Sequence, residues 1–248
     1  MKHHPGNHRQ GGFTLVEIAI VLMIVGLLIG GILRGQELIQ SARVRNIIDQ
    51  KSAIQTAYIG FLDRYRMLPG DLTATQAGIV GNGAQFGAAG SPGSGDGLIT
   101  IGTESTLFFQ NLTASGFLSC GACMSVVVAA GGSGPASTIN NSPINVYGSP
   151  LSVGHVASNT AGSLIEWFDA AAVTRLVVAT GGGIPSQVLA EVDRKADDGL
   201  PSSGQLHFAA GSGATLALCA PGLANTAAGL AVSWANPSQA DCQGAWLF

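Results

Sequence analysis

The chain of 248 residues is 46% hydrophobic and only 10% charged, a composition that excludes an intrinsically disordered protein. Its 36 glycines follow no three-residue period, which excludes collagen. The formal net charge is −3, with an excess of basic residues over residues 1–66 and an excess of acidic residues after them. Phosphate binding needs clustered Lys and Arg, so the acidic remainder predicts no nucleic-acid partner.

Residues 13–33, FTLVEIAIVLMIVGLLIGGIL, form the only long apolar run. At about 1.5 Å per residue, a helix of this length can cross a bilayer. The alternative is a secretory signal peptide, but the run is longer than a signal core and no Ala-x-Ala site follows it. The run therefore predicts a transmembrane helix. Basic residues lie on both sides of it, so their distribution does not decide its orientation.

A single carboxylate, Glu17, interrupts this run. In lipid it costs about 2.5 to 3.5 kcal/mol, so it needs a partner or a purpose. The stretch GGFTLVEIAIVLMIVGLLIG resembles the amino-terminal motif of type IV prepilins and type II secretion pseudopilins: a leader ending in Gly, then Phe-Thr-Leu-x-Glu and an apolar helix. The resemblance implies that residues 1–12 are a leader, that a prepilin peptidase cuts after Gly12, and that the amine of Phe13 is methylated.

The resemblance also implies assembly. In a filament of parallel helices, the Glu17 carboxylate can pair with the Phe13 ammonium of a neighbouring subunit. The alternative is that Glu17 reaches the membrane interface from the end of the span. The expected partners are other pilin or pseudopilin subunits and an inner-membrane assembly platform, besides the peptidase. We expect a single-pass inner-membrane protein with its head in the periplasm, which then enters a pilus or pseudopilus.

Residues 34–66 continue the helix with an amphipathic pattern. Apolar residues share one face at intervals of three, four or seven: Ile47, Ile54, Tyr58, Phe61 and Tyr65. The first helix stop is Pro69-Gly70. A head formed by residues 67–248 is expected to cover this half. The glycines nearer the membrane have two interpretations, close packing between helices or local unwinding in a filament, and we favour packing. They are Gly26, Gly30, Gly31 and Gly35.

The head is predicted to be α+β. Residues 67–102 are rich in small and turn residues, which predicts a loop. Helices are expected at 103–116, with Thr103 as the cap, and at 185–196, starting at Pro185. Short strands are expected at 124–129, 175–180, 205–209, 215–219 and 230–234. The expected fold class is therefore pilin-like α+β, with the long helix packed against an antiparallel sheet.

Two further segments extend the resemblance into the head. Several pilin-like proteins carry YRxLPGD at the end of the long helix and DxKxDDGxPxxG later in the chain. Here the corresponding stretches are RYRMLPGD at residues 64–71 and DRKADDGLPSSG at residues 193–204. These segments favour a large pilin-like subunit over a compact major pilin.

Four cysteines allow three disulfide pairings in an oxidising compartment: Cys120, Cys123, Cys219 and Cys242. We favour Cys120 with Cys123 and Cys219 with Cys242, because the second pair would resemble the carboxy-terminal disulfide loop of many pilins. A zinc site would normally have a second close cysteine pair. Thioredoxin-like chemistry would need a helix after CGAC, whereas MSVVVAA favours a strand.

No cofactor is expected, with calcium as the one candidate. Asp193, Asp197 and Asp198, with Asp96, could supply oxygen ligands for calcium, and the resemblance adds that some pseudopilins bind calcium in their heads. The spacing of these residues does not match an EF-hand loop. The alternative is a helix-ending turn whose carboxylates are solvated or bound to backbone N–H groups. We favour that alternative.

We expect no enzyme active site. The histidines His155 and His207 are isolated, and the Gly181-Gly182-Gly183 run lacks the Lys-Ser/Thr of a phosphate loop. The sequence therefore predicts a structural subunit, minor or accessory, of a type IV pilus or a type II secretion pseudopilus. The alternative function is a membrane-tethered binding module whose head recognises a substrate, a surface or calcium.

Overall fold

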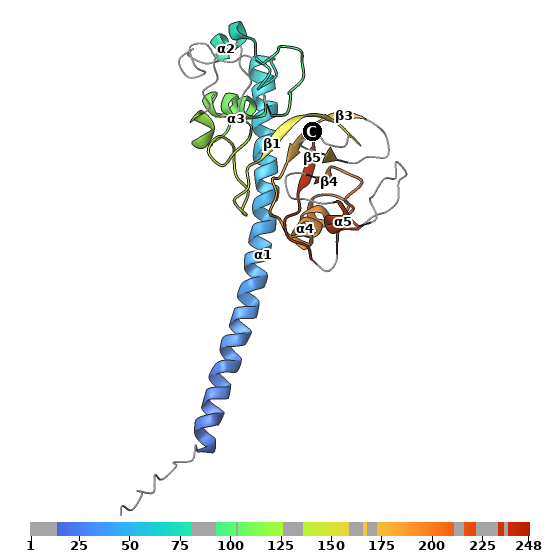
Figure 1. Ribbon diagram of the computed structural model, residues 1–248. Helices are drawn as coiled ribbons and strands as arrows, with labels where there is room; N and C mark the ends of the chain where they lie inside the picture. The colour runs from blue at the N-terminus through green and yellow to red at the C-terminus, as the bar shows by residue number, and fades with distance from the viewer. Residues whose placement is uncertain are drawn as a thin grey trace, which may run out of the picture. The chain divides into compact units, whose positions relative to one another are not determined.

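The computed structural model describes residues 14–80, 93–102, 104–125, 136–158, 166–167, 173–210, 216–221, 233–235 and 238–248. The chain divides into two compact units, Met1–Ala42 and Arg43–Phe248. One helix, α1 (Leu15–Tyr65), contributes to both units (Figure 1). Its 51 residues agree with the long helix that the apolar run and the amphipathic pattern predict.

The part of α1 in the first unit exposes its apolar side chains. Leu15 is 90% exposed and Met23 is 69% exposed, and buried residues begin only at Val44. By length and composition this helix can cross a membrane, and it is the one such helix among the described residues. The length, apolarity and exposure of this half of the helix fit the predicted transmembrane segment.

The part of α1 in the second unit has one buried face. The predicted face residues Ile47, Ile54 and Phe61 are at most 2% exposed, and Tyr58 and Tyr65 are partly buried against the same core. This half is therefore a core element of the head, as expected. The spacing of the buried positions by about one or two helical turns explains why this stripe faces the head.

Five described strands form one antiparallel sheet in the order β1-β3-β5-β4-β2. In this sheet β5 lies between β3 and β4, with Trp246 opposite Val178 on one side and Leu206 on the other. The predicted α+β fold class is confirmed. The strands are β1 (Ser152–Ala157), β2 (Glu166–Trp167), β3 (Thr174–Ala179), β4 (Leu206–Ala210) and β5 (Gly244–Leu247).

The sheet has a buried cluster on each face. Leu176 and Val178 of β3 belong to the main core, whereas Val177 and Ala179 belong to a smaller cluster with Trp167. Since successive strand side chains point to opposite faces, β3 is apolar on both sides. This explains why its sequence, TRLVVA, alternates so little and was still recognisable as a strand.

Helices from three parts of the chain complete the main core. The ring of Phe108 lies 5.9 Å from that of Tyr58 on α1, and Leu189 and Val192 of α4 are buried in the same core. Both predicted helices are confirmed. The predicted cap Thr103, which lies outside the described residues, is wrong, because Glu104 is the N-cap residue of α3; Pro185 is the N-cap residue of α4. The helices are α2 (Ala74–Val80), α3 (Ser105–Ala114), the 3₁₀ helix η1 (Ala122–Ser125), α4 (Ser186–Ala196) and α5 (Leu216–Cys219).

The predicted loop at 67–102 and the predicted strand at 215–219 differ from the structure. The segment 67–102 contains α2, which begins after Thr73 because Thr73 and Gln76 bond to each other's backbone N–H groups in a capping box. Residues 216–219, predicted as a strand, form the helical turn α5 that ends at Cys219. A four-residue apolar segment does not distinguish a strand from a helix by its pattern.

The predicted strand at 124–129 is also wrong where the structure describes it. Met124 and Ser125 end the 3₁₀ helix, in which the N–H of Cys123 bonds the carbonyl of Cys120; residues 126–129 lie outside the described residues. The predicted strand at 230–234 lies largely outside them too, and Ser233 and Trp234 are not in a strand. The strands β3 and β4 were predicted correctly within one residue.

Candidate functional site

The amino-terminal end of α1 holds the residues that the sequence singles out. Gly12 and Phe13 lie outside the described residues. Glu17 lies in the first turn of α1, and its backbone N–H bonds the Thr14 hydroxyl at 3.3 Å. In return, the Thr14 N–H and hydroxyl donate to the Glu17 carboxylate at 3.5 and 3.4 Å. The two residues therefore form a capping box, in long hydrogen bonds.

Sequence reasoning missed the role of Thr14. The signal was present, because Thr-x-x-Glu before an apolar run is the pattern of a capping box. The structure therefore assigns Glu17 a local partner within the same chain. This contact does not neutralise the carboxylate, because Thr14 contributes only neutral donors.

The surface of α1 that follows is apolar and open. From residue 14 to residue 33, Glu17 is the only charged residue. The glycines of this segment are open as well: a Cβ placed on Gly26, Gly30, Gly31 or Gly35 would meet no atom within 4 Å. A helix that is apolar on all sides requires lipid or other helices around it. The favoured role of the glycines, close helix packing, is thus sterically available to a second chain.

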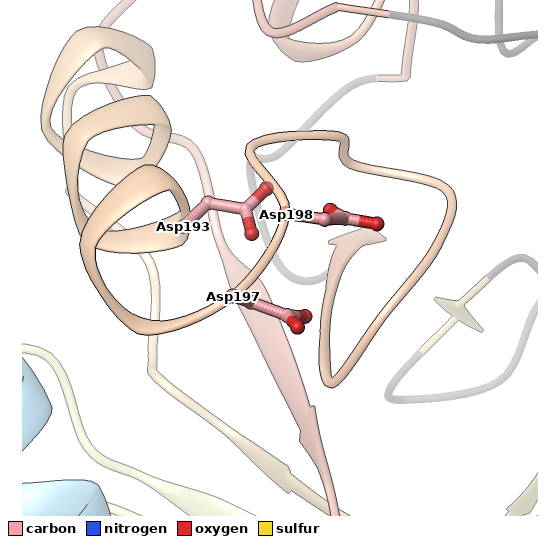
Figure 2. A group of neighbouring side chains, drawn as sticks. All are labelled: Asp193, Asp197 and Asp198. Atoms are coloured by element: carbon pink, nitrogen blue, oxygen red, sulfur yellow. The ribbon is translucent and has the colours of Figure 1, made fainter.

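Three aspartates meet at the carboxyl end of α4. Asp193 lies in its last turn, Asp197 is its C-cap residue, and Asp198 follows. One oxygen from each carboxylate lies within 4.8 Å of one from each of the other two, and all three face the loop that follows the helix (Figure 2). Asp96 takes no part in this group; its carboxylate accepts the N–H of Leu98 at 2.9 Å.

Asp193 is the buried member of the aspartate group. It is 0% exposed, and its Oδ2 accepts the indole N–H of Trp234 at 2.8 Å. Burial raises the pKa of Asp193 to about 7, with further increases from Asp198 and Asp197 and opposing effects from the Trp234 indole and the Gly199 N–H. Such a strongly perturbed carboxyl marks the group as a candidate site.

Asp197 and Asp198 are held by the loop they face. Asp197 Oδ2 accepts the backbone N–H groups of Gln205 and Leu206, the latter at 3.0 Å. Asp198 accepts the N–H of Leu200 at 2.9 Å and the hydroxyl of Ser203 at 2.6 Å. The helix-ending turn that the sequence favours is therefore present. It fixes two carboxylates beside the buried one.

The cysteines form the two favoured pairs. Cys120 is bonded to Cys123, with a Cα–Cα distance of 5.4 Å, and Cys219 is bonded to Cys242, with a distance of 5.7 Å. The second bond joins Cys219, the last residue of α5, to Cys242, which lies two residues before β5; the two cysteines are 23 residues apart in the sequence. No described cysteine is free, so the structure offers no thiolate group for zinc.

Residues 7–33 match the family model of the prokaryotic N-terminal methylation motif. The chain carries the methylation motif of the type IV pilin and pseudopilin family. No curated protein and no solved structure matches the chain. The match covers the proposed cleavage position, Glu17 and the apolar half of α1, and it does not extend into the head.

The head of this pilin-like chain has a second ordered carboxylate group that sequence reasoning missed. Asp71, from the LPGD segment, accepts the N–H of Gly97 at 2.7 Å and the Ser94 hydroxyl at 3.2 Å. Glu104 accepts the N–H groups of Ser94 at 2.6 Å and Thr100 at 2.7 Å. Both carboxylates are 5% exposed and are satisfied by this loop, so the group orders the loop.

The neighbourhood of this loop explains the roles of His155 and Gly70. His155 Nδ1 accepts the N–H of Ile99 at 2.8 Å, and burial lowers the pKa of His155 against the opposing charges of Asp71, Asp96 and Glu104. Gly70 has φ +92° and lies against Glu104, where a Cβ would come within 2.9 Å of the backbone carbonyl. These residues thus have structural partners.

The described part of the pilin-like chain shows structural roles for the remaining histidine and the glycine run. The His207 ring packs edge-on against Trp167 and lies 3.1 Å from the carbonyl of Gly204. Gly181 and Gly183 have positive φ, which fits the turn that the sequence favours. A pocket of about 410 Å³ lies beside this turn, and its single carboxylate, Asp241, accepts the N–H of Gly183 at 2.9 Å. The motif points to a structural subunit and not to an enzyme.

Proposed function

We propose that this chain is a filament subunit, a minor or accessory component of a type IV pilus or a type II secretion pseudopilus. The observation that carries the proposal is the position of the methylation motif. It falls on the half of α1 whose apolar side chains are exposed, with Glu17 as the one charge among residues 14–33. Among the described residues, that half of the helix has no buried side chain.

The exposed half of α1 needs two environments in succession. Before assembly, lipid surrounds its apolar side chains; in a filament, the same side chains pack between the helices of neighbouring subunits. Cleavage after Gly12 creates a positive Phe13 amine, which supplies the countercharge for the Glu17 carboxylate of a neighbour. The capping box of Thr14 and Glu17 supports this arrangement, because it holds the carboxylate at the first turn of the helix.

The head is proposed to remain outside the cytoplasm. Two disulfides in the described part of the head favour an oxidising compartment, the periplasm or the filament surface. The proposed partners are a prepilin peptidase, other pilin or pseudopilin subunits and the inner-membrane assembly platform. The size of the head supports an accessory rather than a major subunit.

The proposal is tested by locating the mature chain. Filaments are sheared from the cells that assemble them, and the filament and membrane fractions are probed for the chain. Mass spectrometry then gives the mass of its amino-terminal peptide. We expect a chain that begins with methylated Phe13 in the filament fraction. A chain that retains residues 1–12, or a processed chain that stays wholly in the membrane fraction, would overturn the proposal and favour the membrane-tethered binding module.

A further inference from the structure

The aspartate group at the end of α4 has the spacing of a single cation site. One oxygen from each of Asp193, Asp197 and Asp198 lies within 4.8 Å of the others. Oxygens bound to one calcium ion at about 2.3 to 2.6 Å can be separated by at most about 5 Å. The three carboxylates project together toward the loop after the helix (Figure 2). One ion can therefore reach an oxygen of each.

The buried aspartate provides an independent observation. Asp193 is 0% exposed, and its Oδ1 has no hydrogen-bond partner among the described residues. The Trp234 indole satisfies only Oδ2, and the nearby Gly199 N–H makes no hydrogen bond to Oδ1. A buried carboxylate oxygen without a partner is unfavourable, because it has lost its water and gained no donor. A cation between the carboxylates would supply the missing partner.

The charge around the group leads to the same conclusion. The carboxylates lie at the carboxyl end of a helix, where the helix dipole is negative and disfavours anions. The Nζ of Lys195, in the last turn of α4, lies 2.7 Å from Glu191 Oε1 and so pairs with Glu191 rather than with one of the three aspartates. Within the described ranges no Lys or Arg forms a salt bridge with any of the three aspartates. In the described part of the chain, the three carboxylates therefore have no ion-pair partner.

The loop after α4 holds the ligands in position. Backbone N–H groups fix Asp197 Oδ2, and Leu200 and Ser203 fix Asp198. Gly204 allows this close approach, because a Cβ there would overlap the Asp197 carboxylate. An ion would be met by ligands that are already ordered, which lowers the entropic cost of binding.

We propose that Asp193, Asp197 and Asp198 bind one calcium ion at the carboxyl end of α4. The all-oxygen, multiply charged ligand set suits a hard cation and not zinc or copper. Calcium accepts irregular geometry with six to eight oxygens, so water and loop carbonyls can complete its shell, whereas magnesium demands a near-ideal octahedron. This inference is independent of filament assembly.

The test measures thermal unfolding of the full chain in detergent micelles, first with a chelator and then with calcium. We expect calcium to raise the unfolding temperature, since an ion bound only by the folded chain stabilises it. Asp193→Asn should abolish the rise and weaken calcium binding at least about tenfold, because ligand charge sets affinity. Asp96→Asn is the matched control: Asp96 makes the same Asx turn as Asp198 without the neighbouring carboxylates, and it should keep the full response.

A second readout uses Trp234, whose indole touches the proposed site. Terbium is a calcium-sized ion that emits when a nearby indole transfers energy to it. We expect Trp-sensitised terbium emission from the wild-type chain, its displacement by calcium, and its loss in Asp198→Asn, which serves if Asp193→Asn fails to fold. Magnesium should not displace terbium at equal concentration. No calcium response in the wild type, or an equal response in Asp193→Asn and Asp198→Asn, would overturn the site and leave a protonated Asp193.

Discussion

The two halves of α1 belong to one continuous helix and use their apolar residues in opposite ways. In residues 15–42 the large apolar side chains are exposed, as at Leu28, which is 60% exposed. In residues 43–65 they are buried, as at Phe61, which is 0% exposed. The second half is satisfied within the chain, and the first half is not. The comparison shows that the apolar side chains of the first half need lipid or other chains around them, which a single chain does not supply.

Removing the charge of Glu17 should have the largest effect on the first half. Glu17→Gln keeps an acceptor for Thr14 and removes the charge that would pair with the Phe13 amine. An unpaired carboxylate in lipid costs about 2.5 to 3.5 kcal/mol. If relief of this cost drives assembly, incorporation into filaments should fall about 100-fold. Quantitative blotting of sheared filaments measures this.

Thr14→Ala is the matched control for that variant. It removes the capping hydroxyl and leaves the Glu17 charge in place, so assembly should continue. If Thr14→Ala stops assembly and Glu17→Gln does not, then Glu17 serves the helix start and not the contact between subunits.

Truncating a buried ring should have the next largest effect, and only on the head. Phe61→Ala removes a ring packed against Tyr65 at 4.8 Å and should lower the free energy of unfolding by about 3 to 5 kcal/mol. Leu28→Ala, on the exposed half, should leave unfolding of the head unchanged. Chemical denaturation followed by Trp fluorescence compares the two. Equal losses would contradict the division of α1 into two functional halves.

The two disulfides should differ in their effect on head stability. Replacing Cys219 and Cys242 by Ser should lower the free energy of unfolding by about 2 to 4 kcal/mol, since that bond closes a longer loop. Replacing Cys120 and Cys123 by Ser should lower the free energy of unfolding by less, because these two cysteines are only three residues apart in the sequence. Melting of both double variants under non-reducing conditions decides the order, and a larger loss for the shorter loop would contradict it.

The smallest expected effect is a pH dependence from His155. Its pKa is lowered in the folded chain, mainly by burial, so the unfolded chain takes up a proton first as the pH falls. The stability contributed by neutral His155 is complete above its usual pKa of about 6.5 and is lost as the pH falls toward the lowered value. Protonation would also remove the acceptor for the Ile99 N–H.

His155→Asn isolates this contribution, because the amide oxygen can still accept the Ile99 N–H but does not titrate in this range. The difference in unfolding free energy between wild type and variant should shrink from about pH 7 to pH 5. The comparison is needed because Asp193 acts in the opposite direction: its pKa is raised to about 7, so its contribution is lost as the pH rises toward that value. A flat difference would show that His155 does not titrate in this way.

Local signals account for the parts of the fold that could be predicted. The buried stripe of Ile47, Ile54 and Phe61 follows helical spacing, and Pro185 marks the start of α4. The three strands β1, β2 and β5 were missed; β2 is only two residues long. Gly154 weakens the strand pattern of β1, although a Cβ there would overlap Ile101, so the glycine is needed for close packing. The strand β5 is four residues long and contains Gly244 and Ala245.

The sequence by itself determined the long helix, its apolar half, the methylation motif and the position of Glu17, because helix periodicity and helix start signals act over a few neighbouring residues. Only the tertiary structure decided which distant groups meet. It brought Trp234 to Asp193, and Asp71 to the loop that ends near His155. Such contacts depend on how strands pair and helices pack, and the spacing of residues along the chain carries no direct record of that.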